Sequence, residues 1–163
     1  MTQHNATPFD FAQRMIGEVV EIPGKAHAPF IQWCFESCNG YGSDTPDEVP
    51  WCSAFANRVA WIFRLPRSKS AAARSWLLVG TPVALADARV GYDVVILKRG
   101  GGGQPGPEVT SGAPGHVAFF AGVDRVDAPS MVSVVGGNQS NGVTVASFPV
   151  ERVLGVRRLL WAS

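Results

Sequence analysis

The sequence has no long apolar run and no excess of charge of one sign. Its 163 residues carry a formal net charge of +1, and no basic cluster is larger than the pair Arg157 and Arg158. Nucleic acid is therefore not an expected partner. No apolar stretch approaches the roughly 18 residues of a membrane span. Met1 to Asn5 also lack the basic and then apolar pattern of a leader, so we expect synthesis in the cytoplasm without a signal peptide and no membrane insertion.

Cysteine is scarce. The three cysteines cannot all pair, which argues against a disulfide framework and favours synthesis in a reducing compartment. Cys34 and Cys38 lie one helical turn apart, but no second Cys/His pair at a finger-like spacing completes a zinc site. Burial of both as small apolar residues is the better interpretation, and no cofactor is expected.

An acidic group lies in the second half of a polar stretch that runs from Asn39 to Val49. Asp44, Asp47 and Glu48 could hold calcium, but they lack the Asp-x-Asp-x-Asp-Gly spacing of a calcium loop. We predict a solvated acidic loop here and keep calcium as the alternative.

The hydrophobic period changes along the chain. Helical spacing predicts helices over 8–19, 28–38, from Cys52 onward, and over 71–79 ending at Gly80. After Gly91, short apolar runs at 94–97, 116–123, 131–135, 143–148 and 153–160 predict strands. Helices followed by strands are typical of an α+β domain with an antiparallel sheet, here one domain over 1–163. The glycine-rich segment 100–107 lacks a phosphate-loop ending and is predicted to be a mobile loop.

A thiol stands where one of these helices begins, at Pro50-Trp51-Cys52-Ser53. Proline favours the first helical turn, and the free amides of that turn stabilise an anion. A helix end contributes at most about 2 kcal/mol, which is less than a strongly activated thiolate requires. A second cation is needed, and His116, within a short apolar run that is typical of a buried strand, is the candidate.

Three motifs in order, Trp51-Cys52-Ser53-Ala54-Phe55, Gly115-His116-Val117 and the run from Gly136 to Asn141, resemble the CHAP and NlpC-type cysteine hydrolases, and more narrowly their short phage and prophage group. The resemblance covers nearly the whole chain. It implies a papain-like fold, in which N-terminal helices pack on a central antiparallel sheet of about five to six strands. It also implies cleavage of amide bonds in bacterial peptidoglycan.

Carried over to this sequence, the resemblance implies that Cys52 is the nucleophile, His116 the general base and acid, and Asn138 the residue that orients the imidazole. Many CHAP domains place a glutamate two residues before the orienting asparagine, and here that position is Gly136. Neighbours on a strand face opposite sides, so only one of Asn138 and Gln139 can easily meet His116, and we predict Asn138. The backbone amide of Cys52 would stabilise the oxyanion, with Tyr41 or Gln139 as candidates for a second donor.

Trp51 and Trp76 are the aromatic candidates for the substrate cleft, with Trp51 as one of its walls. The expected protein is a monomeric peptidoglycan hydrolase of the phage endolysin type without a separate wall-binding domain. Amidase and endopeptidase cleavage both stay open, and an enzyme of an injected toxin system would look the same. The rival hypotheses are a non-catalytic wall-binding or structural domain on this scaffold and a papain-like protease that acts on host proteins.

Overall fold

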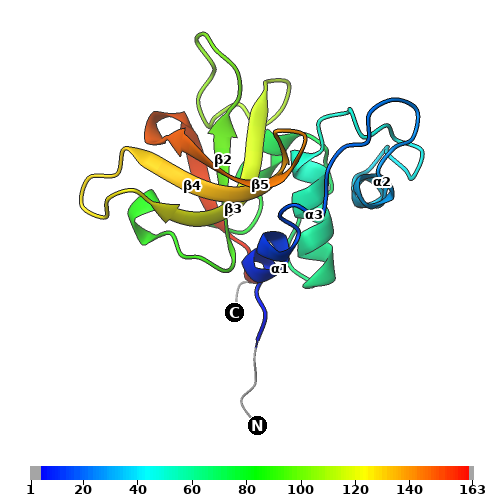
Figure 1. Cartoon of the computed structure of the whole chain (residues 1–163). Coiled ribbons are helices and arrows are strands. Elements are labelled where there is room, and N and C mark those ends of the chain that lie inside the picture. Colours follow the sequence, from blue (N-terminus) through cyan, green and yellow to red (C-terminus); the bar gives the residue numbers. More distant parts are fainter. Residues whose placement is uncertain (1–4, 162–163) are drawn as a thin grey trace.

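The structure, a computed structural model, describes residues 5–161, so most of the amino-terminal segment on which the expectation about a leader rests lies outside it. The described chain is α+β: three α-helices come first, and six strands form one antiparallel sheet. In Figure 1 the helix α3 lies beside the sheet, and α2 lies on the far side of α3. The expected α+β class with an antiparallel sheet is confirmed.

The helices are α1 (Pro8–Arg14), α2 (Pro29–Phe35) and α3 (Cys52–Ile62). Thr7 caps α1 through a capping box, since its hydroxyl accepts from the Asp10 amide while the Asp10 carboxylate accepts from the Thr7 amide. Proline opens both short helices, where its missing N–H costs nothing. Helix α3 is buried from Cys52 through Ala60, because α2 covers one side and the sheet covers the other.

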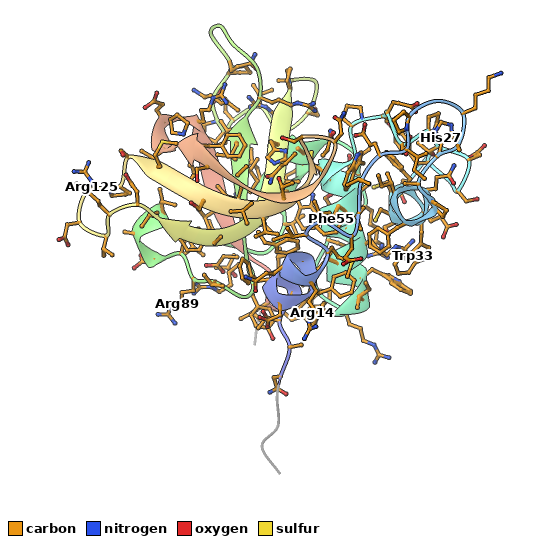
Figure 2. All side chains as sticks on the ribbon, in the orientation of Figure 1. Arg14, His27, Trp33, Phe55, Arg89 and Arg125 are labelled. Carbon is orange, nitrogen blue, oxygen red and sulfur yellow. The ribbon has the colours of Figure 1, made fainter. Side chains whose placement is uncertain are left out.

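The strands are β1 (Thr81–Val83), β2 (Asp93–Lys98), β3 (Gly115–Val123), β4 (Met131–Gln139), β5 (Gly142–Pro149) and β6 (Val153–Arg158). Their order across the sheet is β1, β6, β2, β3, β4, β5. Alternate residues of a strand point to opposite faces of the sheet, and this sheet buries side chains on both faces. Val117 and Phe119 join the core under the helices, where Phe55 of α3 meets the sheet (Figure 2). Ala118 and Phe120 join a second core on the opposite face.

Most predicted elements are present, and the differences have local causes. The predicted helix over 71–79 is a 3-10 helix at Ala73–Leu78. The edge strand β1 was not predicted, because three residues that include Pro82 give no apolar run. No helix in the described part of the chain is long and apolar enough to cross a membrane.

Candidate active site

Cys52 is the first residue of α3, where the sequence predicted a helix to begin. Buried polar bonds hold this turn in place. The Ser53 hydroxyl donates to the Ser70 carbonyl at 2.6 Å and accepts from the Trp76 indole N–H at 2.9 Å. One turn later, the Asn57 amide group donates to the Ser70 carbonyl at 3.0 Å and accepts from the Lys69 amide at 2.8 Å. The start of α3 is therefore fixed to the segment 68–76.

His116 lies near the start of β3 and meets the thiol. The Cys52 thiol and the His116 ring lie close enough for each to shift the pKa of the other, although 64 positions separate them in the sequence. The backbone amide of Val117 is also close to the Cys52 sulfur and lowers the pKa of the thiol. On its other side the His116 ring is bonded through Nε2 to Gln139 Oε1 at 2.8 Å. Because Nε2 is bonded to Gln139, Nδ1 is the nitrogen that remains for the sulfur.

The partner of His116 is Gln139, so the prediction that Asn138 orients the ring is wrong. The cause is a β-bulge in β4. Gly136 pairs with Thr144 and Gln139 with Gly142, so β4 has one residue more than β5 over this interval. Asn138 has φ +57°, a left-handed conformation outside the regular strand. Only one of the two residues meets His116, as alternation predicted, but the bulge makes it Gln139 rather than the Asn138 that the resemblance implied.

Thr144 fixes the orientation of the Gln139 side-chain amide. Its Nε2 donates to the Thr144 carbonyl at 2.7 Å, and a carbonyl can only accept. The amide oxygen therefore faces His116, and the imidazole nitrogen bonded to it must carry a proton. Both ends of the Gln139 amide are used, which removes it as a second oxyanion donor.

The charges of the pair stabilise each other. Burial raises the pKa of Cys52, but the hydrogen bond and charge of His116, the Val117 amide and the charge of Arg99 outweigh it and hold that pKa below its ordinary value. Burial lowers the pKa of His116, but the Cys52 sulfur and the Gln139 amide outweigh it and raise that pKa. Both directions favour a thiolate beside an imidazolium.

The thiols of Cys34 and Cys38 differ from that of Cys52 because their pKa values are raised. Burial is the largest influence on both: it raises the pKa of Cys38 to about 11 and that of Cys34 further. Both are buried and free, as the sequence predicted for small apolar residues.

Two pockets flank the pair. One of about 260 Å³ contains Cys52 among small residues, and its lining consists of Pro50, Cys52, Ala71, Ala72, Ala73, Arg99, Ala113, Pro114 and Gly115. The other, of about 230 Å³, contains His116 and is lined by Lys98, Arg99, His116, Asn138, Gln139, Ser140, Ala146, Phe148 and Arg152. Although Cys52 is only 2% exposed, it thus borders a space that a ligand can enter.

The aromatic cleft candidates lie elsewhere. Trp51 is fully buried: its indole N–H donates to Glu21 at 2.8 Å, and its ring packs edge-on against Phe55. Trp76 is fully buried as well, so neither forms a cleft wall. Tyr41 is exposed, stacks on Phe35 at 5.4 Å and lines neither pocket. The structure therefore brings none of these three to the thiol as a substrate contact.

Arg74 was not predicted as a site residue, yet it positions the strand that carries His116. It is fully buried, and it donates to the carbonyls of Pro105, Gly106, Val109 and Pro114 at 2.9 to 3.1 Å. The second half of the glycine-rich segment is therefore anchored, contrary to the prediction of a mobile loop. No local pattern signals these partners, which are more than thirty positions away.

The acidic loop differs from its prediction at Asp47, which is fully buried rather than solvated. Its carboxylate accepts from the Ile22 and Ala28 amides at 2.9 and 2.8 Å and contacts His27 Nδ1 at 3.0 Å. Burial raises the pKa of Asp47, but these bonds outweigh it and lower that pKa. His27, Asp47 and Glu48 lie close enough together to hold a metal ion, but Asp47 Oδ2 already accepts from two backbone amides and Oδ1 contacts the His27 ring.

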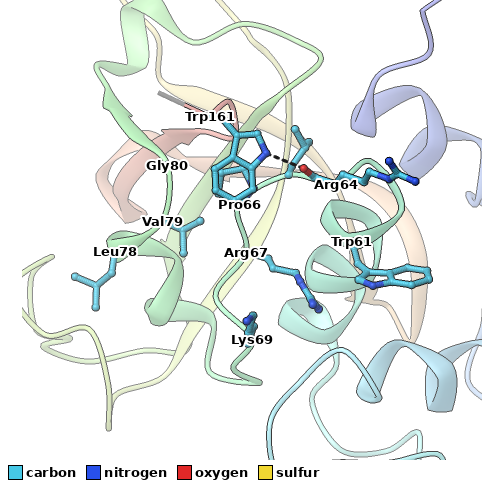
Figure 3. Close-up of a pocket in the computed structure, with 10 residues that line it drawn as sticks. Trp61, Arg64, Pro66, Arg67, Lys69, Leu78, Val79, Gly80 and Trp161 are labelled. Atoms are coloured by element: carbon cyan, nitrogen blue, oxygen red, sulfur yellow. Dashed lines mark hydrogen bonds between the residues drawn. The ribbon is translucent and has the colours of Figure 1, made fainter. Parts of the chain in front are cut away.

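A further pocket, of about 620 Å³, lies near the opposite end of α3 from Cys52. Figure 3 shows Trp61 and Trp161 at its rim, with Trp161 Nε1 donating to the Arg64 carbonyl at 2.8 Å. It contains none of the residues that the sequence predicted for the site.

Comparison of the chain with models of known protein families gives no match, and no curated protein matches it either.

Proposed function

We propose that this chain is a cysteine hydrolase of papain-like architecture that cleaves an amide bond of bacterial peptidoglycan. The observation that carries the hydrolase part is the pairing of Cys52, at the start of a helix, with an imidazole whose far nitrogen is held by Gln139. The peptidoglycan part is supported by the ordered motifs around Cys52, His116 and Gly136–Asn141, which resemble the CHAP and NlpC-type enzymes.

The reaction has two halves. The Cys52 thiolate attacks the amide carbon and forms a C–S bond, while the carbonyl oxygen takes the negative charge beside the first amides of α3. As the C–N bond breaks, the imidazolium gives its Nδ1 proton to the departing amine and leaves an acyl thioester. Water then attacks the thioester, His116 takes a proton from it, and the C–S bond breaks to restore the thiolate.

Gln139 does not touch the reacting atoms in this scheme. It holds the proton on Nε2 of His116 and keeps Nδ1 toward the sulfur, which is the role that the sequence assigned to Asn138. Cys52, His116 and Gln139 are thus the proposed catalytic and positioning set.

The linkage that is cut is either the lactyl amide between muramic acid and L-alanine or a bond in the stem or cross-bridge peptide. Both place an amide carbon at the thiolate and an amine at the imidazolium. An endolysin that acts on the wall as a monomer, without metal, is the proposed biological form.

Purified cell walls test this function. The parent protein should solubilise walls and create new amino groups, and Cys52→Ala and His116→Ala should abolish release while circular dichroism shows an intact fold. Mass spectrometry of the released fragments then identifies the scissile bond. Release by Cys52→Ala at the parental rate would refute the mechanism. Binding without release would instead support a non-catalytic domain, and inert walls with a cleaved protein substrate would support a host-directed protease.

A further inference from the structure

The pocket beside His116 is strongly cationic. Lys98, Arg99 and Arg152 line it, and none of its described lining residues carries a carboxylate. Arg152 donates to the Gly100 carbonyl at 3.2 Å, and within residues 5–161 none of the three takes part in an ion pair. Their charges are therefore available to a ligand.

The sheet fixes these cations next to the reacting pair. Lys98 pairs with Gly115, the residue before His116, and Leu97 pairs with Val153, the residue after Arg152. Lys98 and Arg152 thus occupy neighbouring strand ends. Arg99 follows β2 directly and lines both the Cys52 pocket and the His116 pocket, so it lies where the two spaces adjoin.

The chemistry decides which part of a substrate enters this pocket. Attack by the thiolate leaves the acyl fragment on Cys52, whereas the departing nitrogen must reach the His116 proton. The amine fragment therefore lies on the His116 side. There it meets the three cations and the half-buried Ala146 and Phe148.

We propose that this pocket binds a free carboxylate on the amine fragment of the substrate. The inference rests on the proposed hydrolase function and narrows its substrate class to peptide-like amides whose leaving amine carries a carboxylate close to the new amino group. Two guanidinium groups and one ammonium suit a carboxylate, since arginine can bind both of its oxygens.

Two alkylating reagents of nearly equal size test this directly, because iodoacetate carries a carboxylate and iodoacetamide does not. The ratio of their rates at Cys52 cancels any change in the thiolate fraction. We expect the ratio in the parent to exceed that of a free thiol in solution. Lys98→Glu, Arg99→Glu and Arg152→Glu should each lower the ratio by about three- to tenfold at low salt. Added salt should lower it in the parent, because ions screen the pocket.

The matched control is Arg125→Glu, which makes the same charge reversal on the β3–β4 connection, far from the pocket (Figure 2). It should keep the parental ratio. Arg99 is exposed, so Arg99→Glu stays informative if the variants at the half-buried Lys98 and Arg152 do not fold. A parental ratio equal to that of a free thiol, or equal effects of Arg125→Glu and Arg99→Glu, would overturn the proposal.

The outcome is separable from that of the wall assay. If the protein does not solubilise walls but the pocket variants lower the alkylation ratio, peptidoglycan is refuted as the substrate and the carboxylate pocket is supported. If the protein solubilises walls but the pocket variants leave the alkylation ratio unchanged, only the carboxylate pocket is refuted. With active walls, amidating the wall carboxylates should raise KM in the parent and have little effect on the KM of Arg99→Glu.

Discussion

Replacing Gln139 by leucine removes the amide that holds the His116 imidazole. The Gln139–His116 bond is 2.8 Å long, and both residues are 6% exposed, so bulk water does not readily replace it. Hydrogen bonds to a charged group contribute about 1.5 to 3 kcal/mol. The neutral imidazole keeps a weaker form of this bond, of about 0.5 to 1.5 kcal/mol, so a difference of about 1 to 1.5 kcal/mol favours the ion pair. Since about 1.4 kcal/mol is a factor of ten, the thiolate–imidazolium pair should lose about five- to tenfold in population relative to the neutral pair.

The two pKa values determine how this substitution changes the pH dependence of Cys52 reactivity. The pKa of Cys52 is lowered chiefly by His116 against the effect of burial, and that of His116 is raised by Cys52 and Gln139 against burial. The ion pair therefore exists above the lowered pKa of Cys52 and below the raised pKa of His116. In Gln139→Leu the imidazolium is less stable, so its pKa falls and that of Cys52 rises. Alkylation of Cys52 should begin at higher pH than in the parent.

The assay is the rate of iodoacetamide alkylation of Cys52 from about pH 4 to pH 9. The matched control is Asn138→Gly, because glycine accepts the positive φ of this position and only the side chain is lost. It should reproduce the parental profile. If Asn138→Gly moved the profile to higher pH and Gln139→Leu left it unchanged, the assignment of the orienting residue would be refuted.

Three further predictions concern the surroundings of the thiol. Iodoacetamide at about pH 6 should modify Cys52 alone of the three cysteines in the folded protein and all of them after unfolding, as counted by mass spectrometry. Gly137→Ala should lower the free energy of unfolding by about 1 to 3 kcal/mol, because its Cβ would lie 2.4 Å from the Trp51 ring, whereas Gly101→Ala, with nothing within 4 Å, should have little effect in the same urea titration. Ala72→Phe should slow wall release and Cys52 alkylation at an unchanged melting temperature, because Ala72 is an exposed residue of the thiol pocket; equal rates would show that the thiol is approached from elsewhere.

The sequence predicted what depends on neighbours in the chain. The helix that starts at Cys52 and the strand that carries His116 follow from proline position and apolar period, and the structure has both. The choice between Asn138 and Gln139 depends on pairing with β5, which local pattern does not contain. The glycines at 136 and 137 were a usable signal, since glycine inside a strand often marks a bulge.

The sequence also could not predict which polar and aromatic side chains are buried. An aromatic residue beside a nucleophile suits a cleft or a core equally well in sequence, and Trp51 is core because Gly137 lets its ring approach the sheet. Asp47 is charged and yet buried, because the amides that satisfy it come from residues 22 and 28. Such partners are known only once the chain is folded.

The anchoring of the β2–β3 connection by Arg74 has a practical consequence for engineering. The carbonyls of Pro105 and Pro114 are bonded to Arg74, and β2 is fixed in the sheet, whereas the glycines between them have open space around them: a Cβ at Gly101 or Gly103 would meet nothing within 4 Å. Each doubling in length of a flexible connection costs only about 0.6 kcal/mol. This short segment should accept a grafted tag or fluorophore, which would place a reporter near the Cys52 thiol while leaving the framework of the domain intact.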